Sequence, residues 1–240
     1  MSEPQSTSIA ANLESIRARV AAAIARRGAD PSTASPVQLI GVSKRQPLAK
    51  LEAAYAAGLR DFGENYAQEL RDKLGTWPAE ANDARWHYIG AIQSNKLKYL
   101  VGKVALIHTV DRVELIHAIE RRAASAGGVQ EFLLEVNLAD EQQKAGVPPA
   151  LVPTLLDACR ATAHARCVGL MIIPPAAEPE QTRRFFRELR ELRDRLREGP
   201  ERPGVDLREL SMGMSADFEV AIEEGATLVR VGTAIFGARP

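Results

Sequence analysis

The stretch LIGVSKRQP, Leu39 to Pro47, runs from apolar residues through a lysine to a proline. An apolar run of this kind is typical of a strand in a parallel sheet, which is buried on both faces. Pro47 favours the first turn of a helix, because its fixed φ suits that position and its missing N–H is not needed there. The stretch therefore predicts a strand followed directly by a helix, with Lys44 at the carboxyl end of the strand.

The same strand-then-helix pattern repeats along the whole chain. Short apolar runs predict strands over residues 37–43, 60–63, 85–90, 104–109, 131–137, 167–173, 207–213 and 227–232. Apolar residues spaced three and four apart predict helices over residues 9–27, 47–58, 64–75, 95–100, 112–125, 150–163, 179–198 and 217–225. The repeats favour the α/β class and a single (β/α)8 barrel of the TIM type with an extra N-terminal helix. A doubly wound open sheet is the alternative, because the alternation does not show that the sheet closes.

Length and composition point to one domain that needs no metal or disulfide. We expect residues 1–240 to form a single domain, with residues 1–8 disordered. Basic and acidic residues number 31 each, and this balance argues against nucleic acid or an anionic membrane as a partner. Cys159 and Cys167 form no CxxC motif and the histidines lack zinc spacing, so we expect no metal and a reduced, cytoplasmic location. The polar N-terminus resembles neither a signal peptide nor a membrane span.

Polar residues gather at the carboxyl ends of the predicted strands, where a barrel of this type carries its chemistry. One such residue would mean little, but a ring of them suggests a site. The ring consists of Lys44, Glu64, Asn65, Gln93, Ser94, Asn95, Asn137, the segment Met212 to Ser215, Arg230, Gly232 and Thr233.

Lys44 is the candidate nucleophile of this ring. Burial disfavours an ammonium and leaves a neutral amine that can attack a carbonyl, as a Schiff-base lysine requires. The alternative is a lysine that extends its ammonium to solvent or pairs with an acid such as Glu64.

The segments after the last two predicted strands suggest a phosphate site. Barrels of this type often bind phosphate there through backbone N–H groups. Ser215 and Thr233 supply hydroxyls, and Gly232 lets the backbone approach an anion; helix capping is the alternative role of the two hydroxyls. A reactive lysine that faces a phosphate site fits pyridoxal 5′-phosphate (PLP).

Arg230 points to the same cofactor. An arginine against the pyridine nitrogen would leave that nitrogen unprotonated and the ring a poor electron sink, because a guanidinium is not readily deprotonated. The alternative is a structural ion pair between Arg230 and Glu209 or Glu223.

Several linked motifs resemble the pyridoxal phosphate homeostasis family (the YggS/PROSC/PLPBP group), which is related to the barrel domain of alanine racemase. The resemblance covers about Ile9 to Gly237. It rests on GVSK, FGENY, WHYIGAIQSNK, LLEVNL with the nearby KAGV, GLMIIPP, LSMGMSADFEVAI and VRVGTAIFG. Two short runs, VSKRQP and ADEQQKAGV, depart from the usual family pattern. The resemblance therefore does not define which contacts the rim of the site makes.

The resemblance implies a cofactor site in a single barrel. It implies PLP on Lys44 as a Schiff base, with the phosphate held by Ser215, Gly232 and Thr233. It places Asn65 and Met214 on either side of the ring, Ile89 beside the cofactor, and Arg230 near the ring nitrogen.

The resemblance also implies a monomeric carrier that serves vitamin B6 homeostasis and hands PLP to apoenzymes, without known turnover. The alternative is a PLP-dependent amino-acid racemase, which needs a base on each face of the substrate. In alanine racemase the second base is a tyrosine from another domain, and this chain shows no such domain. A third possibility is an aldolase-like barrel that uses Lys44 on sugar phosphates.

Overall fold

The computed structural model describes residues 8–27, 36–139 and 145–238. Residues 1–7, which we expected to be disordered, lie outside this range. Ser8, expected to be disordered with them, is described as the N-cap of the first helix, where its Oγ accepts a hydrogen bond from the Ala11 N–H at 3.2 Å.

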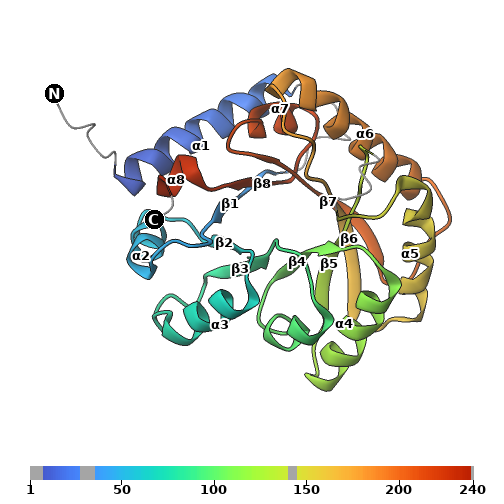
Figure 1. Cartoon of the computed structure of the whole chain (residues 1–240). Helices are drawn as coiled ribbons and strands as arrows, with labels where there is room; N and C mark the ends of the chain where they lie inside the picture. The colour runs from blue at the N-terminus through green and yellow to red at the C-terminus, as the bar shows by residue number, and fades with distance from the viewer. Residues whose placement is uncertain (1–7, 28–35, 140–144, 239–240) are drawn as a thin grey trace.

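The predicted closed barrel is confirmed. Eight parallel strands run in chain order around the barrel, and β8 pairs with β1 to close it (Figure 1). The strands are β1 Gln38–Val42, β2 Asp61–Glu64, β3 Arg85–Tyr88, β4 Leu106–Val110, β5 Gln130–Glu135, β6 Ala165–Met171, β7 Val205–Met214 and β8 Leu228–Val231. Because the sheet closes on itself, the open-sheet alternative is wrong.

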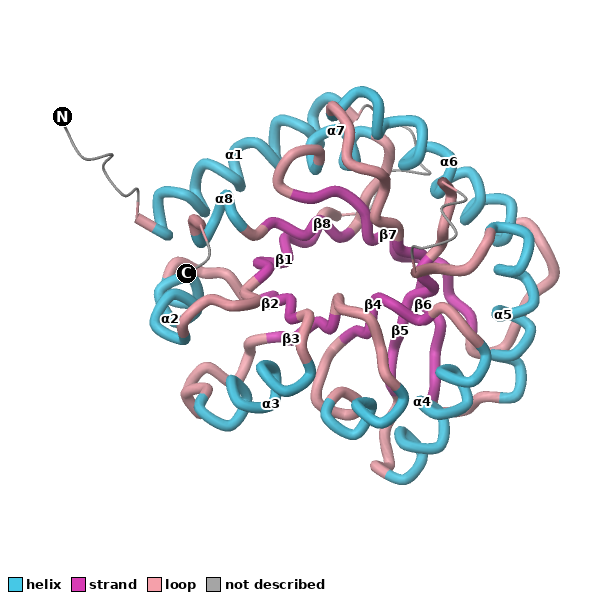
Figure 2. Tube along the Cα trace, in the orientation of Figure 1, coloured by secondary structure: helices cyan, strands magenta, loops and turns pink. Residues whose placement is uncertain are grey.

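Helices surround the ring of strands on its outer side (Figure 2). The α-helices are α1 Ile9–Arg26, α2 Leu48–Ala56, α3 Ala67–Thr76, α4 Val113–Ser125, α5 Val152–Ala158, α6 Pro179–Arg197, α7 Phe218–Glu223 and α8 Thr233–Phe236. The described part of the chain also contains the 3-10 helices η2 Ser94–Tyr99, η3 Pro149–Leu151 and η4 Cys159–Ala161. Within the described ranges, no helix has both the length and the apolar character needed to cross a membrane.

Several predicted element ends are wrong by a few residues. β1 ends at Val42, so Lys44 lies in the turn after the strand. The helix expected over residues 95–100 is the 3-10 helix η2, in which the Lys96 N–H bonds the Gln93 carbonyl three residues earlier. The helix expected over residues 150–163 is divided into η3, α5 and η4; prolines at 149 and 153 fit only the first turns of a helix.

The core has two layers. A smaller cluster fills the inside of the barrel, and a larger one lies between the strands and the surrounding helices. The inner cluster consists of Ile40, Leu106, Leu133, Val168, Met171 and Leu228, all less than a tenth exposed. This inner packing closes the middle of the barrel, so a ligand can enter only from its two ends.

The extra helix α1 crosses the seam where the barrel closes and holds α8 in place (Figure 1). The Asn12 side chain donates a hydrogen bond to the Ile235 carbonyl at 2.9 Å. From α2, the Lys50 ammonium donates to the Phe236 carbonyl at 2.6 Å. These bonds fix the short helix that begins at Thr233, directly after its N-cap Gly232.

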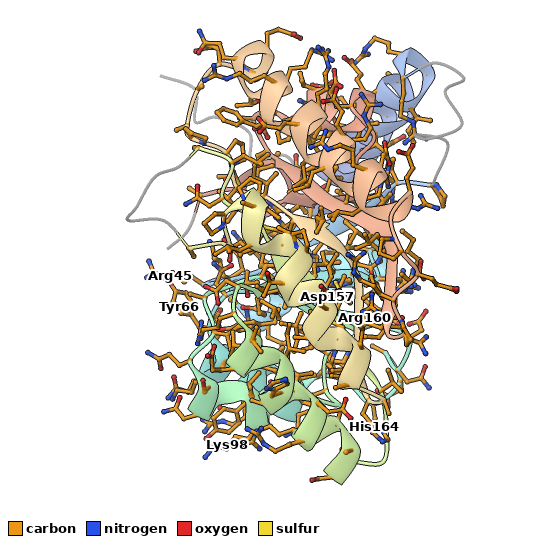
Figure 3. All side chains as sticks on the ribbon, turned by 90° about the vertical axis from the view of Figure 1, so that its right-hand side faces the viewer. Arg45, Tyr66, Lys98, Asp157, Arg160 and His164 are labelled. Atoms are coloured by element: carbon orange, nitrogen blue, oxygen red, sulfur yellow. The ribbon has the colours of Figure 1, made fainter. Side chains whose placement is uncertain are left out.

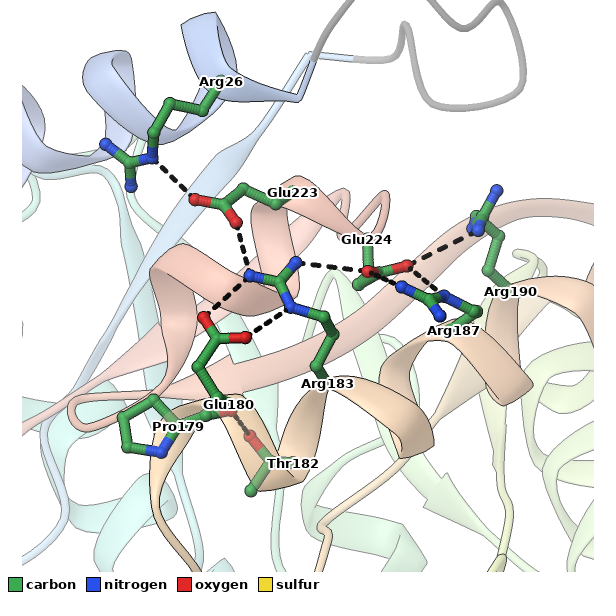
Figure 4. A network of polar contacts seen from close by, with 9 residues as sticks. All are labelled: Arg26, Pro179, Glu180, Thr182, Arg183, Arg187, Arg190, Glu223 and Glu224. Carbon is green, nitrogen blue, oxygen red and sulfur yellow. Dashed lines mark hydrogen bonds and ion pairs between the residues drawn. The ribbon is translucent and has the colours of Figure 1, made fainter.

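The last residue of α7, Glu223, and its C-cap, Glu224, lie in an ion-pair network with α6 and α1 (Figure 4). Arg183 of α6 bonds Glu223 at 2.7 Å and Glu224 at 3.2 Å, and Arg26 of α1 bonds Glu223 at 2.7 Å. Burial alone would raise the pKa of Glu224, but the arginines around it, Arg187 and Arg183 first, lower that pKa overall. The network anchors the helix that follows the loop after β7.

Candidate functional site

A cavity of about 290 Å³ opens at the carboxyl ends of the strands. All eight side chains or backbone positions predicted to bind the cofactor line it. They are Lys44, Asn65, Ile89, Met214, Ser215, Arg230, Gly232 and Thr233. Three further lining residues, Val42, Ile173 and Ala216, were not predicted.

Lys44 lies half-buried in a tight turn directly after β1. The Gln46 N–H donates to the Ser43 carbonyl at 3.0 Å and closes the turn. Arg45 has φ of 58°, which is the left-handed region that few non-glycine residues adopt. Its N–H donates to the Glu69 carboxylate at 2.6 Å, so a side chain from α3 holds this unusual backbone conformation.

Arg45 also marks the rim of the cavity. Its guanidinium lies 5.4 Å from the centre of the Tyr66 ring and donates to the Tyr66 hydroxyl at 3.2 Å. Figure 3 shows this pair at one end of the barrel and His164 towards the other end. The end that carries Arg45 and Tyr66 is the end that carries Lys44.

A buried ion pair lies beneath the Lys44 turn. The Lys73 ammonium donates to Glu64 at 2.6 Å, to Glu69 at 2.8 Å and to the Ser43 carbonyl at 2.8 Å. Ser43 Oγ also donates to the Glu64 carboxylate, at 2.6 Å. Glu64, the acid we considered as a partner of Lys44, is therefore held by Lys73 and Ser43 instead.

Glu64 keeps one oxygen without a protein partner. Its Oε2 is buried and accepts no hydrogen bond within the described part of the chain. Burial raises the pKa of Glu64, and the charge and hydrogen bond of Lys73 act in the opposite direction. The pKa is raised overall, so the contacts of Oε1 offset only part of the cost of burying the anion.

Asn65 reaches the cavity because the ends of β2 and β3 approach each other closely. A Cβ on Gly90 would lie 2.1 Å from the Asn65 carbonyl oxygen, so only glycine fits there. Asn65 Oδ1 is buried and accepts no hydrogen bond among the described residues. A buried amide oxygen in this state indicates a place for a ligand or an ordered water.

The loop after β7 brings Ser215 to the opposite wall of the cavity. Gly213 has φ of +88°, and a Cβ there would lie 2.6 Å from the Ala221 Cβ, so the loop requires glycine. The Met214 N–H donates to the Asp217 carboxylate at 2.7 Å and fixes the turn.

Ser215, Gly232 and Thr233 meet at this wall. The Gly232 N–H donates to Ser215 Oγ at 3.2 Å, which joins the loop after β7 to the end of β8. A side chain on Gly232 would enter the space beside Val42, with its Cβ 3.3 Å from the Val42 Cβ. The group presents two hydroxyls and unobstructed backbone, which is a suitable surface for a small anion.

Arg230 lines the cavity from inside the barrel and is only 3% exposed. Its guanidinium donates to Ser211 Oγ at 2.6 Å and to the Ile172 carbonyl at 2.9 Å. Burial lowers the pKa of Arg230 to about 10, while the charges of Glu135 and Asp217 raise it. The guanidinium therefore stays charged at neutral pH.

The alternative ion pairs considered for Arg230 are wrong. Glu209 accepts a hydrogen bond from Thr227 at 2.6 Å and contacts Arg208. Glu223 belongs to the network with Arg26 and Arg183 described above. The acids whose charges act on Arg230 are Glu135 and Asp217, and the pKa of Glu135 is raised to about 7 by burial and then by Asp111.

Other members of the predicted polar ring lie outside the cavity. Gln93 lines a neighbouring cavity of about 310 Å³, which Asn65 also borders. Ser94 and Asn95 begin η2 and are exposed, whereas Met212 is fully buried. The Asn137 N–H bonds the Val147 carbonyl at 3.0 Å. These residues shape the rim and its surroundings rather than the cavity wall.

The three lining residues that were not predicted are apolar. Val42 precedes Lys44 by two residues, Ala216 follows Ser215, and Ile173 stands in the segment predicted as the sixth strand. Strand periodicity could have found Val42, which points to the same side of the strand as the inward-facing Ile40. Nothing in the residue type marks Ile173 or Ala216.

Comparison with known proteins identifies the family of the chain. The family profile described as "Alanine racemase, N-terminal domain" matches residues 7–240. The pyridoxal phosphate homeostasis protein of Aquifex aeolicus is 46% identical over 84% of this chain and 87% of its own length. That of Pseudomonas aeruginosa is 42% identical over 97% of this chain and 96% of its own length.

A solved structure has the same fold. The structure of PipY from Synechococcus elongatus PCC7942 with PLP bound superposes with a TM-score of 0.79 at 37% identity, covering 95% of this chain and all of that one. The profile match extends over almost the whole chain, and the curated relatives exceed two fifths identity. The chain therefore belongs to the family of the alanine racemase N-terminal domain and, within it, to the pyridoxal phosphate homeostasis proteins.

Proposed function

We propose that this protein binds PLP in the cavity at the carboxyl ends of the strands and serves vitamin B6 homeostasis as a carrier of the cofactor. The observation that carries the proposal is the convergence of eight residues from five strand ends on one cavity of about 290 Å³. The names of the relatives and the PLP-bound PipY structure support it.

The residues of the cavity fit the functional groups of PLP. When bound, the cofactor supplies an aldehyde for an amine and a pyridine ring that can withdraw electrons. Lys44 provides the amine, and Ser215, Gly232 and Thr233 provide the surface for the phosphate. The buried Oδ1 of Asn65, which accepts no hydrogen bond from any described residue, supports the presence of a ligand beside it.

Ile89, Met214 and Arg230 complete the assignment. Ile89 is buried and Met214 is 37% exposed, so apolar side chains flank the space between Lys44 and the phosphate surface. Arg230 faces the ring nitrogen and, as a permanent cation, keeps that nitrogen unprotonated. Electron withdrawal by the ring is then weak, which suits a carrier better than an enzyme that forms carbanions.

The composition of the cavity wall also supports a carrier. Among the described residues that line it there is no tyrosine, histidine, cysteine or carboxylate. Two tyrosines adjoin lining residues in the sequence. Tyr88, before Ile89, is buried, donates to the Ala91 carbonyl at 3.1 Å and has its pKa raised to about 12 by burial. Tyr66, after Asn65, is exposed at the rim, and its hydroxyl accepts from Arg45 at 3.2 Å. A second base for proton transfer on the far face of a substrate is therefore missing from this wall.

Exposure of the rim supports exchange of the cofactor. Met214 and Thr233 are exposed and Lys44 is half-buried, so the site opens towards solvent. We include in the proposal a cytoplasmic, monomeric carrier that passes PLP to apoenzymes. The second candidate is an amino-acid racemase, which the name of the matching family favours.

One experiment tests the proposal directly. The purified protein is incubated with PLP, reduced with borohydride, digested and analysed by mass spectrometry. We expect the phosphopyridoxyl mass on the peptide that contains Lys44. An adduct on another lysine, or none at all, would refute the assignment.

A parallel assay separates the carrier from the racemase. The PLP-loaded protein is incubated with L-alanine or D-alanine, and the enantiomers are separated by chiral chromatography. We expect negligible conversion; turnover of about 1 s⁻¹ or more, an ordinary enzymatic rate, would favour the racemase.

A further inference from the structure

A chain of buried polar side chains runs through the barrel from the candidate cofactor site. Arg230 donates to Ser211 Oγ at 2.6 Å, and Ser211 Oγ lies 2.8 Å from His108 Nδ1. His108 Nε2 lies 3.0 Å from His87 Nδ1, and His87 Nε2 lies 3.0 Å from Asp61 Oδ1. Each of these five residues is at most 5% exposed, so the chain is closed to solvent along its length.

Asp61 anchors the far end of the chain, near the amino ends of the strands. Arg85 binds its carboxylate with two hydrogen bonds of 2.8 and 2.7 Å, and the Gln38 amide donates to it at 2.6 Å. Burial alone would raise the pKa of Asp61, but the hydrogen bonds from His87 and Arg85 lower it overall. The carboxyl is therefore an ionised acceptor.

Asp61 can only accept hydrogen bonds and Arg230 can only donate them. These two ends therefore fix the direction in which each hydrogen bond between them is donated. Asp61 can only accept, so His87 Nε2 carries a hydrogen. If His87 is neutral, its Nδ1 accepts from His108 Nε2–H, and His108 Nδ1 accepts from the Ser211 hydroxyl. Ser211 Oγ in turn accepts from Arg230, so every hydrogen bond in the chain is satisfied.

The opposite direction leaves a buried group without a partner. A protonated His87 would donate from Nδ1 to His108, and His108 would donate from Nδ1 to Ser211. Ser211 Oγ would then accept from both His108 and Arg230, and its own hydrogen would lose its acceptor in a fully buried position. Such an orphaned hydroxyl is costly. Burial, as the largest cause, also holds the pKa of His108 well below its usual value, which favours a neutral imidazole.

We propose that Ser211, His108 and His87 are positioning residues, which hold the Arg230 guanidinium against the cofactor through a one-way hydrogen-bond chain that ends on Asp61. Both imidazoles are neutral and carry their hydrogen on Nε2. Arg230 donates from Nη1 to Ser211 and from Nη2 to the Ile172 carbonyl. Because both terminal nitrogens are held, the plane of the guanidinium is set. The inference rests on the proposed function, because it takes Arg230 to face the ring nitrogen of PLP.

The direction of the chain can be measured without any cofactor. Histidine side chains labelled with ¹⁵N report the tautomer of each ring through their two-bond couplings. We expect the Nε2–H tautomer for both His87 and His108 in the cofactor-free protein at neutral pH. A protonated His87, or an Nδ1–H tautomer of His108, would overturn the proposed chain whether or not the protein binds PLP.

The positioning role requires a second measurement with PLP. Ser211→Ala removes the acceptor of Arg230, whereas Ser211→Thr keeps a hydroxyl at the same place. Because a hydrogen bond to a charged group is lost, we expect Ser211→Ala to weaken PLP binding about tenfold or more, and Ser211→Thr to restore much of it. His117→Gln, on the exposed face of α4, is the matched control and should leave binding unchanged.

A spectroscopic readout distinguishes positioning from a general structural effect. PLP labelled with ¹⁵N at the ring nitrogen is bound to each variant, and its chemical shift is recorded between pH 6 and pH 9. We expect the Ser211→Ala shift to differ from wild type, since Arg230 is no longer held, while the thermal unfolding midpoint changes little. An unchanged ring-nitrogen shift and unchanged affinity would overturn the positioning role. Failure of the wild-type protein to bind PLP would instead refute the proposed function, and the tautomer measurement would still test the chain.

Discussion

The Lys73 ammonium lies 2.6 Å from the Glu64 carboxylate, and both side chains are buried beneath the turn that carries Lys44. Removal of one partner of a buried ion pair leaves the other charge uncompensated, which typically costs about 3–5 kcal/mol. We therefore expect Lys73→Met to lower the free energy of unfolding by about 3 kcal/mol or more. Urea denaturation monitored by circular dichroism measures this change.

Two further variants test whether the loss of stability comes from the broken ion pair. Lys103→Met, at an exposed position, should change the free energy of unfolding by no more than about 0.5 kcal/mol. The double variant Lys73→Met with Glu64→Gln should recover part of the loss, because the stranded carboxylate is then gone. A Lys73→Met protein as stable as wild type would show that the pair does not support the turn.

Glu135 predicts a dependence of stability on pH. Its folded-state pKa of about 7 lies above the ordinary value of 4.5, so the folded protein holds a proton that the unfolded chain has lost. The free energy of unfolding therefore falls as pH rises from about 4.5 to about 7, and the loss persists above pH 7. We expect Glu135→Gln to stabilise the protein by about 3 kcal/mol at pH 8 and by only about 1 kcal/mol at pH 5.

Urea titrations of the wild type and variant at the two pH values provide the measurement. Glu52→Gln, at an exposed position on α2, is the control and should show no such difference between pH 5 and pH 8. Equal stabilisation by Glu135→Gln at both values would contradict the raised pKa.

Substitution by alanine should have opposite effects on stability at Gly213 and at Gly75. At Gly213, φ is +88° and an added Cβ would lie 2.6 Å from the Ala221 Cβ, so Gly213→Ala should destabilise the protein by about 2 kcal/mol or more and weaken PLP binding. At Gly75, within α3, no heavy atom lies within 4 Å of the added Cβ. Gly75→Ala should stabilise by about 0.5–1 kcal/mol, because alanine favours the helix. Thermal unfolding of the two variants tests the contrast, and destabilisation of both would argue against it.

Lys44→Ala should remove the covalent cofactor and preserve the fold. The lysine lies in a turn closed by backbone bonds and supported by Glu69 and Lys73, so the turn does not depend on the Lys44 side chain. We expect the visible absorbance of the PLP-loaded protein to disappear in Lys44→Ala and to persist in Lys98→Ala, an exposed lysine of η2. A borohydride-fixed adduct in the Lys44→Ala protein would locate the attachment elsewhere.

The sequence predicted the barrel and the cavity residues because both depend on local signals. The alternation of apolar runs with amphipathic helices marks each unit, and the functional residues stand directly after the strands, as Lys44, Asn65 and Ser215 do. Parallel strands bring such positions together at one end of the barrel, so their order in the chain was enough to group them.

Contacts between distant strands could not be predicted in this way. Glu64 was considered as a partner of Lys44 on the neighbouring strand, yet Lys73 reaches it from α3. The chain from Arg230 to Asp61 was also missed. Its members lie on five different strands, and only the closed barrel shows that they face one another.

The pairing of β1 with β8 has a consequence for biosynthesis. The lysine proposed to capture the aldehyde stands directly after the first strand, whereas the residues proposed to receive the phosphate follow the last two strands. A nascent chain therefore has the reactive amine long before it has the complete pocket. A chain interrupted before β8 would carry the amine without the surface for the phosphate.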